Sequence, residues 1–233
     1  DIYSEFGTDE IYHRIITEAD KLERHVGKAS VLGLGYQMGA PKFQMTLAKG
    51  ALGGPKVAFS LQHTQSIVNA YRRRYAKIAG GWKICADIIE QMAAGIEGSH
   101  KCLRWGNDNG IGYIDLPNGM RLKYPDLRKA RGDQGWDEWT YQSGDIRKKI
   151  YGGLLTENLV QALARIIVAW QMLQIDKKYP VVMTTHDEAV THPKTREAQK
   201  CYDFMIKWMS TPPWWCADLP LAAEGGWDER YSK

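Results

Sequence analysis

Apolar residues recur with two different periods along the 233-residue chain. In the first half they return every three or four positions, the spacing of an amphipathic helix, first in short pieces over residues 1–16 and then over residues 40–94. In the second half, strand-like segments flank another stretch with the helical period. This pattern predicts an α+β fold, with helices first and then a small antiparallel β-sheet with flanking helices.

The helical period of residues 40–94 is interrupted twice. Pro55 breaks it once, and the pair Gly80 and Gly81 breaks it again. We therefore expect two further helices after the proline, at residues 57–79 and 82–94.

A β-hairpin is predicted at residues 112–125. Alternating residues flank Pro117, Asn118 and Gly119, which favour a tight turn. The polar and cationic residues 126–149 that follow are expected to form a surface excursion.

A well-marked amphipathic helix is predicted at residues 154–173. Its polar line carries Glu157, Gln161 and Arg165, which recur every fourth residue. Any amphipathic helix has a polar face, so Gln161 taken alone fits a solvated side chain as well as a binding residue.

A second hairpin is predicted after Pro180. Residues 181–185 have strand character, and residues 189–191 can run back beside them, which leaves His186, Asp187 and Glu188 at a tight turn. A hairpin tip lifts a carboxylate out of the sheet while the ladder of hydrogen bonds holds it rigid. The same acidic turn also fits a purely solvated loop.

A cationic stripe is predicted on a helix within residues 23–39. Arg24, Lys28, Leu32 and Tyr36 recur every fourth residue and would share one face, with Arg24 and Tyr36 about 18 Å apart. A guanidinium and an ammonium one turn apart suit phosphate oxygens, and the phenol ring would cover a base or sugar. This geometry fits a nucleoside triphosphate along the helix, although solvated cations on an amphipathic helix give the same pattern.

Four glycines also fall within this stretch, and each weakens a helix. We expect either that the helix ends near Gly33 or that another group approaches its backbone closely. The glycine spacing differs from that of a dinucleotide-binding loop, and no strand precedes it.

The composition is that of an ordinary globular protein, with 44% hydrophobic and 25% charged residues and a net charge of +4. The modest excess of cations is compatible with nucleic acid. No apolar run is long enough to cross a bilayer and the start is unlike a signal peptide, so a cytoplasmic location is expected. The four cysteines lack zinc-site spacing, which favours free thiols: Cys85, Cys102, Cys201 and Cys216.

Together these stretches resemble family A DNA polymerases, the DNA polymerase I type, and most of all the phage members. The stripe resembles motif B of their fingers helix. The resemblance implies that Arg24 and Lys28 hold the incoming deoxynucleoside triphosphate (dNTP), that Lys28 assists pyrophosphate departure, and that Tyr36 lies near the nascent base pair. Leu32 stands where bacterial members usually have an aromatic residue, which bears on sugar discrimination, and Gln37 stands where Gly is usual.

Two further motifs resemble the same family. Residues 151–165 are similar to its palm helix, which implies that Gln161 reads the minor-groove edge of primer-template DNA and that Asn158 also contacts DNA. His186, Asp187 and Glu188 are similar to motif C. The resemblance makes Asp187 a ligand of catalytic Mg²⁺, Glu188 an accessory carboxylate and His186 a donor to the primer terminus.

The resemblance implies a fingers subdomain at residues 1–110 and the carboxyl-terminal part of a palm at residues 111–233. Template-directed synthesis of this kind uses two Mg²⁺ ions. The motif A aspartate of the family would lie before Asp1. We therefore expect a carboxyl-terminal fragment, or one subunit of a split polymerase, that needs a companion polypeptide or upstream segment carrying motif A, the thumb and any exonuclease domain.

Two alternatives stay open at this point. A single-subunit RNA polymerase shares the palm and a similar motif B, but usually has His-Asp-Ser in motif C. A catalytically silent DNA-binding or assembly subunit of a replication complex would retain the fold without turnover.

Overall fold

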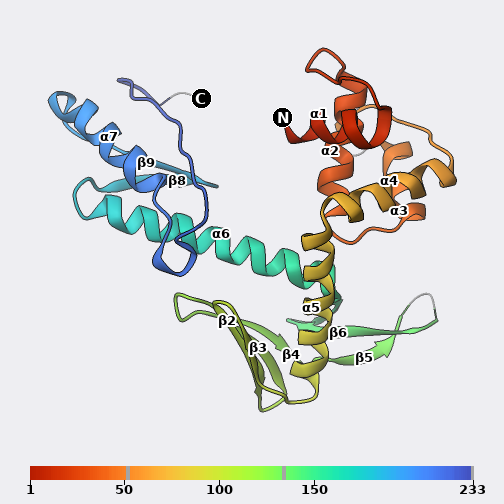
Figure 1. Cartoon of the computed structure of the whole chain (residues 1–233). Helices are drawn as coiled ribbons and strands as arrows, with labels where there is room; N and C mark the ends of the chain where they lie inside the picture. Colours follow the sequence, from red (N-terminus) through yellow and green to blue (C-terminus); the bar gives the residue numbers. More distant parts are fainter. Residues whose placement is uncertain (51–52, 133–134, 232–233) are drawn as a thin grey trace. The chain divides into compact units, whose positions relative to one another are not determined.

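The two periods seen in the sequence correspond to a mixed helical and β-sheet structure, so the α+β prediction is confirmed. A computed structural model describes residues 1–50, 53–132 and 135–231 (Figure 1). Its contacts define two units that interleave along the sequence. The first unit comprises residues 1–98, 105–114 and 122–158, and the second comprises residues 99–104, 115–121 and 159–233, described to residue 231. The assignment of residues 1–110 to fingers and 111–233 to palm stays a prediction.

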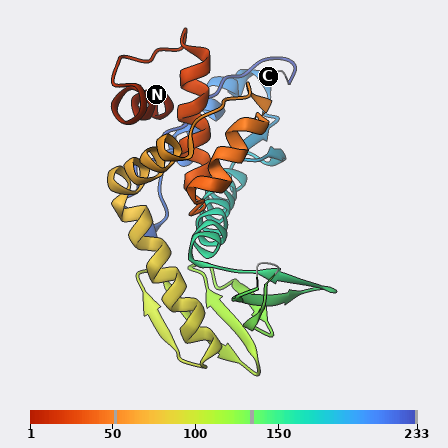
Figure 2. The ribbon, with the colours of Figure 1, turned by 90° about the vertical axis from the view of Figure 1, so that its right-hand side faces the viewer.

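Helices dominate the start of the first unit. They are α1 (Ile2–Phe6), the π-helix η1 (Gly7–Tyr12), α2 (Lys21–Leu34), α3 (Ala40–Lys49), α4 (Leu61–Arg74) and α5 (Ala76–Ala93). Figure 2 shows α2, α3 and α4 gathered around one end of α5. Their shared core is apolar and includes the fully buried side chains of Phe6, Val26, Phe43 and Ile67.

The break between α4 and α5 falls at Tyr75, so the predicted break at Gly80 and Gly81 is wrong. Tyr75 leaves the helical conformation with ψ 46°, and its ring packs against those of Phe6 and Tyr71. The two glycines lie inside α5. Each costs a helix about 1 kcal/mol relative to Ala, whereas burying one large apolar side chain yields about 1.5–3 kcal/mol. The free energy gained by the buried face of α5 therefore exceeds the cost of the two glycines. The buried residues of this face are Trp82, Cys85, Ile88, Ile89 and Met92.

The hairpin predicted at residues 112–125 is confirmed as β3 (Ile111–Asp115) and β4 (Arg121–Pro125). The Leu116 amide donates to the Met120 carbonyl at 2.8 Å, and Gly119 supplies the positive φ of 82° that the turn requires. Two strands that the sequence did not predict extend the sheet to the order β1-β2-β3-β4, namely β1 (Gly98–His100) and β2 (Leu103–Asp108).

The polar segment 126–149 forms a three-stranded antiparallel sheet that the sequence did not predict. Its strands, in the order β5-β6-β7, are β5 (Arg128–Arg131), β6 (Asp137–Ser143) and β7 (Ile146–Lys149). Within this sheet Lys149 of β7 forms an ion pair with Glu138 of β6. The Tyr141 ring of β6 also packs edge-on against Tyr124 of β4, in the other sheet, with ring centroids 5.1 Å apart. These partners are distant in sequence, so local patterns do not reveal them.

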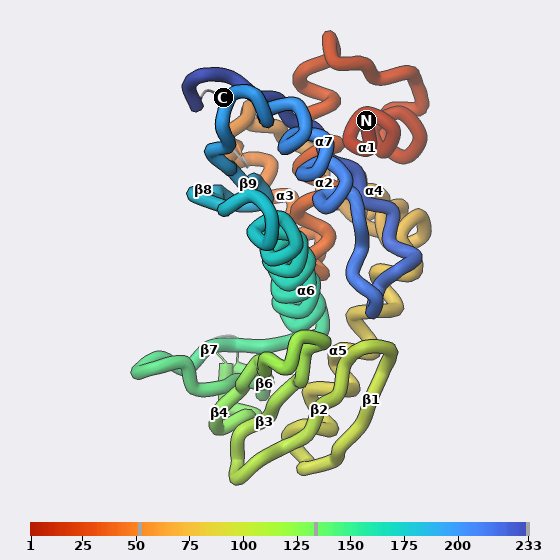
Figure 3. The backbone as a smooth tube through the Cα atoms, turned by 90° about the vertical axis from the view of Figure 1, so that its left-hand side faces the viewer, coloured from red at the N-terminus to blue at the C-terminus, as the bar shows by residue number. Residues whose placement is uncertain are grey.

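The predicted helix at residues 154–173 is confirmed as α6 (Gly152–Asp176), which is longer at both ends. The second unit continues with the hairpin of β8 (Val181–Thr185) and β9 (Glu188–Thr191), followed by α7 (Ala198–Met209). Figure 3 shows α7 beside this hairpin, and Thr191 of β9 contacts Cys201 and Met205 of α7. All four cysteines are free thiols. Among the described residues, no helix is long and apolar enough to cross a membrane.

Candidate nucleotide-binding helix and metal-binding turn

A network of hydrogen bonds around Asp20 fixes the start of α2. Its carboxylate accepts from the amide and hydroxyl of Thr17, both at 2.9 Å, and from Arg14 at 2.9 Å. These bonds, the Thr17 amide first, lower the pKa of Asp20 to about 2. The helix that follows buries Val26, Ala29, Ser30 and Leu34. Arg24, Lys28 and Leu32 lie outside this buried set and are at least partly accessible.

Both expectations about the glycines of this stretch are confirmed. The helix ends at Leu34, next to Gly33 and Gly35. The backbone of α1 also approaches α2 closely, because a Cβ atom at Gly27 would overlap the carbonyl oxygen of Tyr3. Gly27 therefore lets α1 pack directly on the helix that carries the cations.

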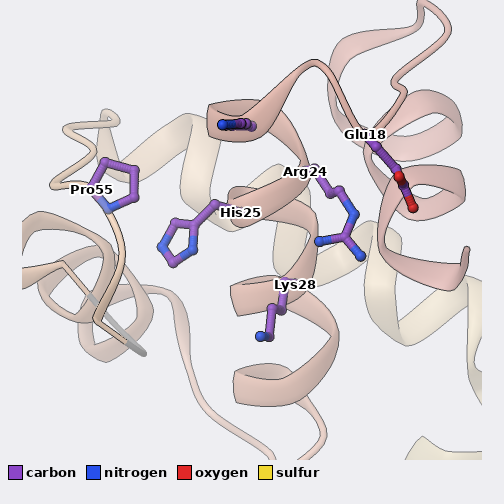
Figure 4. Close-up of a pocket in the computed structure, with 6 residues that line it drawn as sticks. Glu18, Arg24, His25, Lys28 and Pro55 are labelled. Carbon is purple, nitrogen blue, oxygen red and sulfur yellow. The ribbon is translucent and has the colours of Figure 1, made fainter.

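A basic pocket of about 510 Å³ opens beside α2 (Figure 4). In Figure 4, Arg24 points toward Glu18, the His25 ring points toward Pro55, and Lys28 extends from the next turn. The pocket is lined by Glu18, Lys21, Arg24, His25, Lys28 and Pro55. Three cationic side chains and one carboxylate make this a site with a net attraction for anions.

The Arg24 guanidinium is already engaged at one edge. Its Nε donates to the Asp1 carboxylate at 2.6 Å, and its Cζ lies 5.7 Å from the centre of the Tyr3 ring. The side chain is still 34% exposed. A phosphate that binds Arg24 would therefore meet a partly accessible guanidinium and compete with Asp1.

Tyr36 lies outside the helix, so the prediction of one continuous helical stripe to Tyr36 is wrong. The Tyr36 amide donates to the Gly33 carbonyl at 3.3 Å in the turn after α2, because the glycine-rich end of the helix does not continue. Burial raises the pKa of the Tyr36 phenol, as do the charge of Glu157 and a hydrogen bond to it. The ring is 40% exposed, and the exposed Leu32 precedes it by one turn on α2.

The turn after α2 also touches the amino end of α6, which the sequence did not predict. The Gln37 side-chain oxygen accepts from the Gly153 amide at 2.9 Å, and the Tyr151 hydroxyl donates to the Tyr36 carbonyl at 3.3 Å. The departure from the usual Gly at position 37 was the one available signal that this residue has a special role.

The acidic hairpin has the predicted pairing. Thr184 lies opposite Ala189, Met183 opposite Val190 and Val181 opposite Thr191, with a bulge between Val181 and Met183. The turn itself contains only His186, with φ 54°, and the exposed Asp187.

Glu188 is not in the turn, contrary to the prediction. It is the first residue of β9 and pairs with Thr185, because the two-residue turn closes the ladder one position earlier. Its carboxylate accepts from the Tyr231 hydroxyl at 3.2 Å. The Arg165 guanidinium of α6 reaches the same hairpin and donates to the His186 carbonyl at 3.4 Å.

The polar residues of α6 have different surroundings. Gln161 and Arg165 are exposed one turn apart, as the polar line predicted. The Asn158 amide donates to the Tyr124 hydroxyl at 3.2 Å, and burial raises the pKa of that tyrosine to about 12. Asn158 therefore has an internal partner in addition to its predicted contact with DNA.

The hairpin carries two carboxylates of the kind that bind Mg²⁺. Mg²⁺ prefers hard oxygen ligands and is commonly held by one or two carboxylates together with phosphates and waters. Asp187 and Glu188 are adjacent carboxylates on a stiff hairpin and fit that partial set. Over the described ranges, which omit residues 51–52, 133–134 and 232–233, no group of three acidic, His or Cys side chains is placed to hold a metal ion.

No protein-family model matches the chain. A DNA polymerase of Bacillus phage SP02 is 31% identical to it over 231 residues. The chain is similar to a phage DNA polymerase. The similarity covers 94% of the chain and 34% of that polymerase, so the chain spans about one third of the length of this relative. Because so little of the chain is left out, the stretch from Arg24 to Asp187 falls within the similar region.

Proposed function

We propose that this chain is part of a DNA-directed DNA polymerase of the family A type, in which it supplies the dNTP-binding helix and one metal-binding carboxylate. The observation that carries the proposal is the basic pocket on α2, which is lined by Lys21, Arg24 and Lys28. Support comes from the similarity of nearly the whole chain to a phage DNA polymerase.

Arg24 and Lys28 would contact the triphosphate in different ways. The planar Arg24 guanidinium suits two phosphate oxygens at once, and the Lys28 ammonium acts as a compact charge. As pyrophosphate leaves, Lys28 would stabilise the negative charge that develops on it. Tyr36 would lie against the nascent base pair, and Leu32 would leave more room near the sugar than an aromatic residue does.

Asp187 would hold catalytic Mg²⁺, with Glu188 beside it. When bound, a pair of such ions activates the primer 3′ hydroxyl and neutralises charge on the leaving group. His186 would donate a hydrogen bond to the primer terminus. Gln161 would contact the minor groove of primer-template DNA, where every base pair offers acceptors at similar positions, so a neutral amide can sense pair shape without reading sequence.

In this proposal, the complete polymerase contains further polypeptide beyond these 233 residues. The chain spans about one third of the length of its phage relative. Motif A with its carboxylate, the thumb and any exonuclease domain would come from a companion polypeptide or another part of the same protein. The 233 residues alone would then bind dNTP but extend primers poorly, and efficient primer extension by the purified chain would contradict this part.

The proposal is tested by titrating the 233-residue chain with dATP and Mg²⁺. Lys28→Ala is expected to weaken binding roughly tenfold to a hundredfold, because a charge-assisted hydrogen bond is lost. Lys49→Ala removes an exposed lysine at the end of α3, outside the pocket, and serves as the matched control. Equal affinity of wild type and Lys28→Ala would refute the assignment of the pocket.

A second measurement addresses the sugar. In the complete polymerase, the rate with deoxynucleotides is expected to exceed the rate with ribonucleotides. The reverse preference would favour the RNA polymerase alternative.

A further inference from the structure

Gln37 has a strained backbone conformation, and a contact of its side chain must offset the free-energy cost of that strain. Its φ is 61°, in the left-handed region that costs an L-residue free energy and favours Gly. It directly follows Tyr36, in the turn at the end of α2. A glutamine at such a position needs a stabilising contact that glycine cannot make.

That contact is a helix cap. The Gln37 Oε1 atom accepts from the Gly153 amide at 2.9 Å. Gly153 is the second residue of α6, and amides in the first turn of a helix have no partner within that helix. The side chain of Gln37 therefore satisfies the amino end of α6 from the turn that carries Tyr36.

Close approach of the two segments depends on the glycine at position 153. A Cβ atom there would lie 2.6 Å from the Gln37 Cβ atom and 3.0 Å from the Tyr36 carbonyl oxygen. Two more contacts join the same segments: Tyr151 donates to the Tyr36 carbonyl, and the Tyr36 phenol hydrogen-bonds Glu157. Both the backbone and the ring of Tyr36 are thus attached to the start of α6.

We propose that Gln37 is a positioning residue, whose cap on α6 holds Tyr36 in place as a wall of the nucleotide site. The inference deepens the proposed function and rests on it for the role of Tyr36. Gln37 itself does not contact the nucleotide.

Three substitutions separate this role from a contribution to stability alone. Gln37→Gly removes the cap and relieves the strain of the left-handed backbone. Gln37→Ala removes the cap but keeps that strain. Gln37→Glu keeps an acceptor of the same reach at the amino end of a helix, where negative charge is favourable. His13→Gly is the matched control. It relieves another left-handed residue of the same unit, with φ 51°, at the end of η1.

The readouts are dATP affinity of the 233-residue chain, its thermal midpoint, and the mobility of the Tyr36 ring by relaxation of ¹³C-labelled tyrosine. Both Gly and Ala variants are expected to bind dATP roughly tenfold more weakly and to show a more mobile Tyr36 ring. Gln37→Glu is expected to resemble wild type in both. Only the Ala variant should melt clearly lower, and His13→Gly should change neither affinity nor ring mobility.

Two results would overturn the inference. One is a Tyr36 ring that stays as rigid in the Gly and Ala variants as in wild type. The other is a loss of affinity confined to the variant with the lower thermal midpoint, since that pattern is a stability effect. If wild type fails to bind dATP, the proposed function falls, and the mobility of Tyr36 then decides by itself whether Gln37 positions that ring.

Discussion

The Nε atom of Arg24 donates a 2.6 Å hydrogen bond to the carboxylate of Asp1. The same carboxylate caps α1, because it accepts from the Tyr3 amide at 3.1 Å and from the Ser4 hydroxyl at 3.2 Å. The guanidinium proposed to bind phosphate is therefore held in place by an acidic residue. This arrangement orients Arg24 and at the same time competes with a triphosphate.

Asp1→Asn is expected to strengthen dATP binding about twofold to fivefold, since a partly exposed ion pair is worth roughly 0.2–1 kcal/mol. Asparagine still caps α1, so the helix should remain intact. Titration of the 233-residue chain with dATP measures the effect. Glu5→Gln, which changes another exposed carboxylate of α1, is the control. Unchanged affinity in Asp1→Asn would mean that Arg24 does not reach the phosphates.

Asp187→Ala is expected to lower primer extension by several orders of magnitude in the polymerase that contains this chain, because the metal loses a ligand. Its side chain is exposed at a hairpin turn, so the unfolding midpoint should change little. Asp145→Ala is the matched control, since Asp145 is exposed in the turn between β6 and β7. A silent DNA-binding or assembly subunit predicts instead that both variants retain full turnover.

Gly27→Ala is expected to destabilise the chain by about 1–3 kcal/mol, because its methyl group would overlap the Tyr3 carbonyl and force α1 away from α2. Gly80→Ala is expected to stabilise the chain by about 1 kcal/mol, because the added Cβ would meet no described atom within 4 Å beyond its chain neighbours and the nearby backbone of α5, and Ala favours the helix interior. Denaturant unfolding measures both changes. Changes in unfolding free energy of opposite sign would separate the effect of packing at Gly27 from that of helix propensity at Gly80. Changes of the same sign would contradict the prediction.

Asp20→Asn is expected to reduce stability at neutral pH and to have a much smaller effect at pH 2. The folded-state pKa of Asp20 is about 2, below its ordinary value of 3.8, because the Thr17 amide, Arg14 and the Thr17 hydroxyl stabilise the carboxylate. A carboxyl group with a lowered folded pKa contributes stability above its unfolded pKa and loses it as pH falls through the folded pKa. The difference in unfolding free energy between wild type and variant should therefore shrink between about pH 4 and pH 2. A difference that is constant over this range would argue against the hydrogen-bond network.

Several elements of the fold and site follow from the local sequence. The helical period predicted α6, turn residues predicted the β3–β4 hairpin, and strand residues on both sides of His186 and Asp187 predicted β8 and β9 with their pairing. The four-residue spacing of Arg24 and Lys28 also predicted that these cations share one face of a helix. These features depend on neighbours within a few residues, so periodicity and turn chemistry are sufficient to predict them.

Several misses depend on packing or pairing between segments that single local patterns do not describe. The glycines at positions 80 and 81 stay helical because the buried face of α5 outweighs their propensity, while Tyr75 breaks the helix among aromatic rings. The sheet at residues 128–149 is stabilised by pairs between strands. Local propensity contains no term for either effect.

The sequence by itself determined the α+β class, the cationic face of α2 and the acidic hairpin turn. Only the tertiary structure decided that Tyr36 leaves the helix, that Asp1 pairs with Arg24, and that Gln37 caps α6 across 116 positions. The physical reason is that spacing along the chain sets which side chains share a helix face or a turn, whereas burial and folding of the whole chain set which groups from separate segments meet.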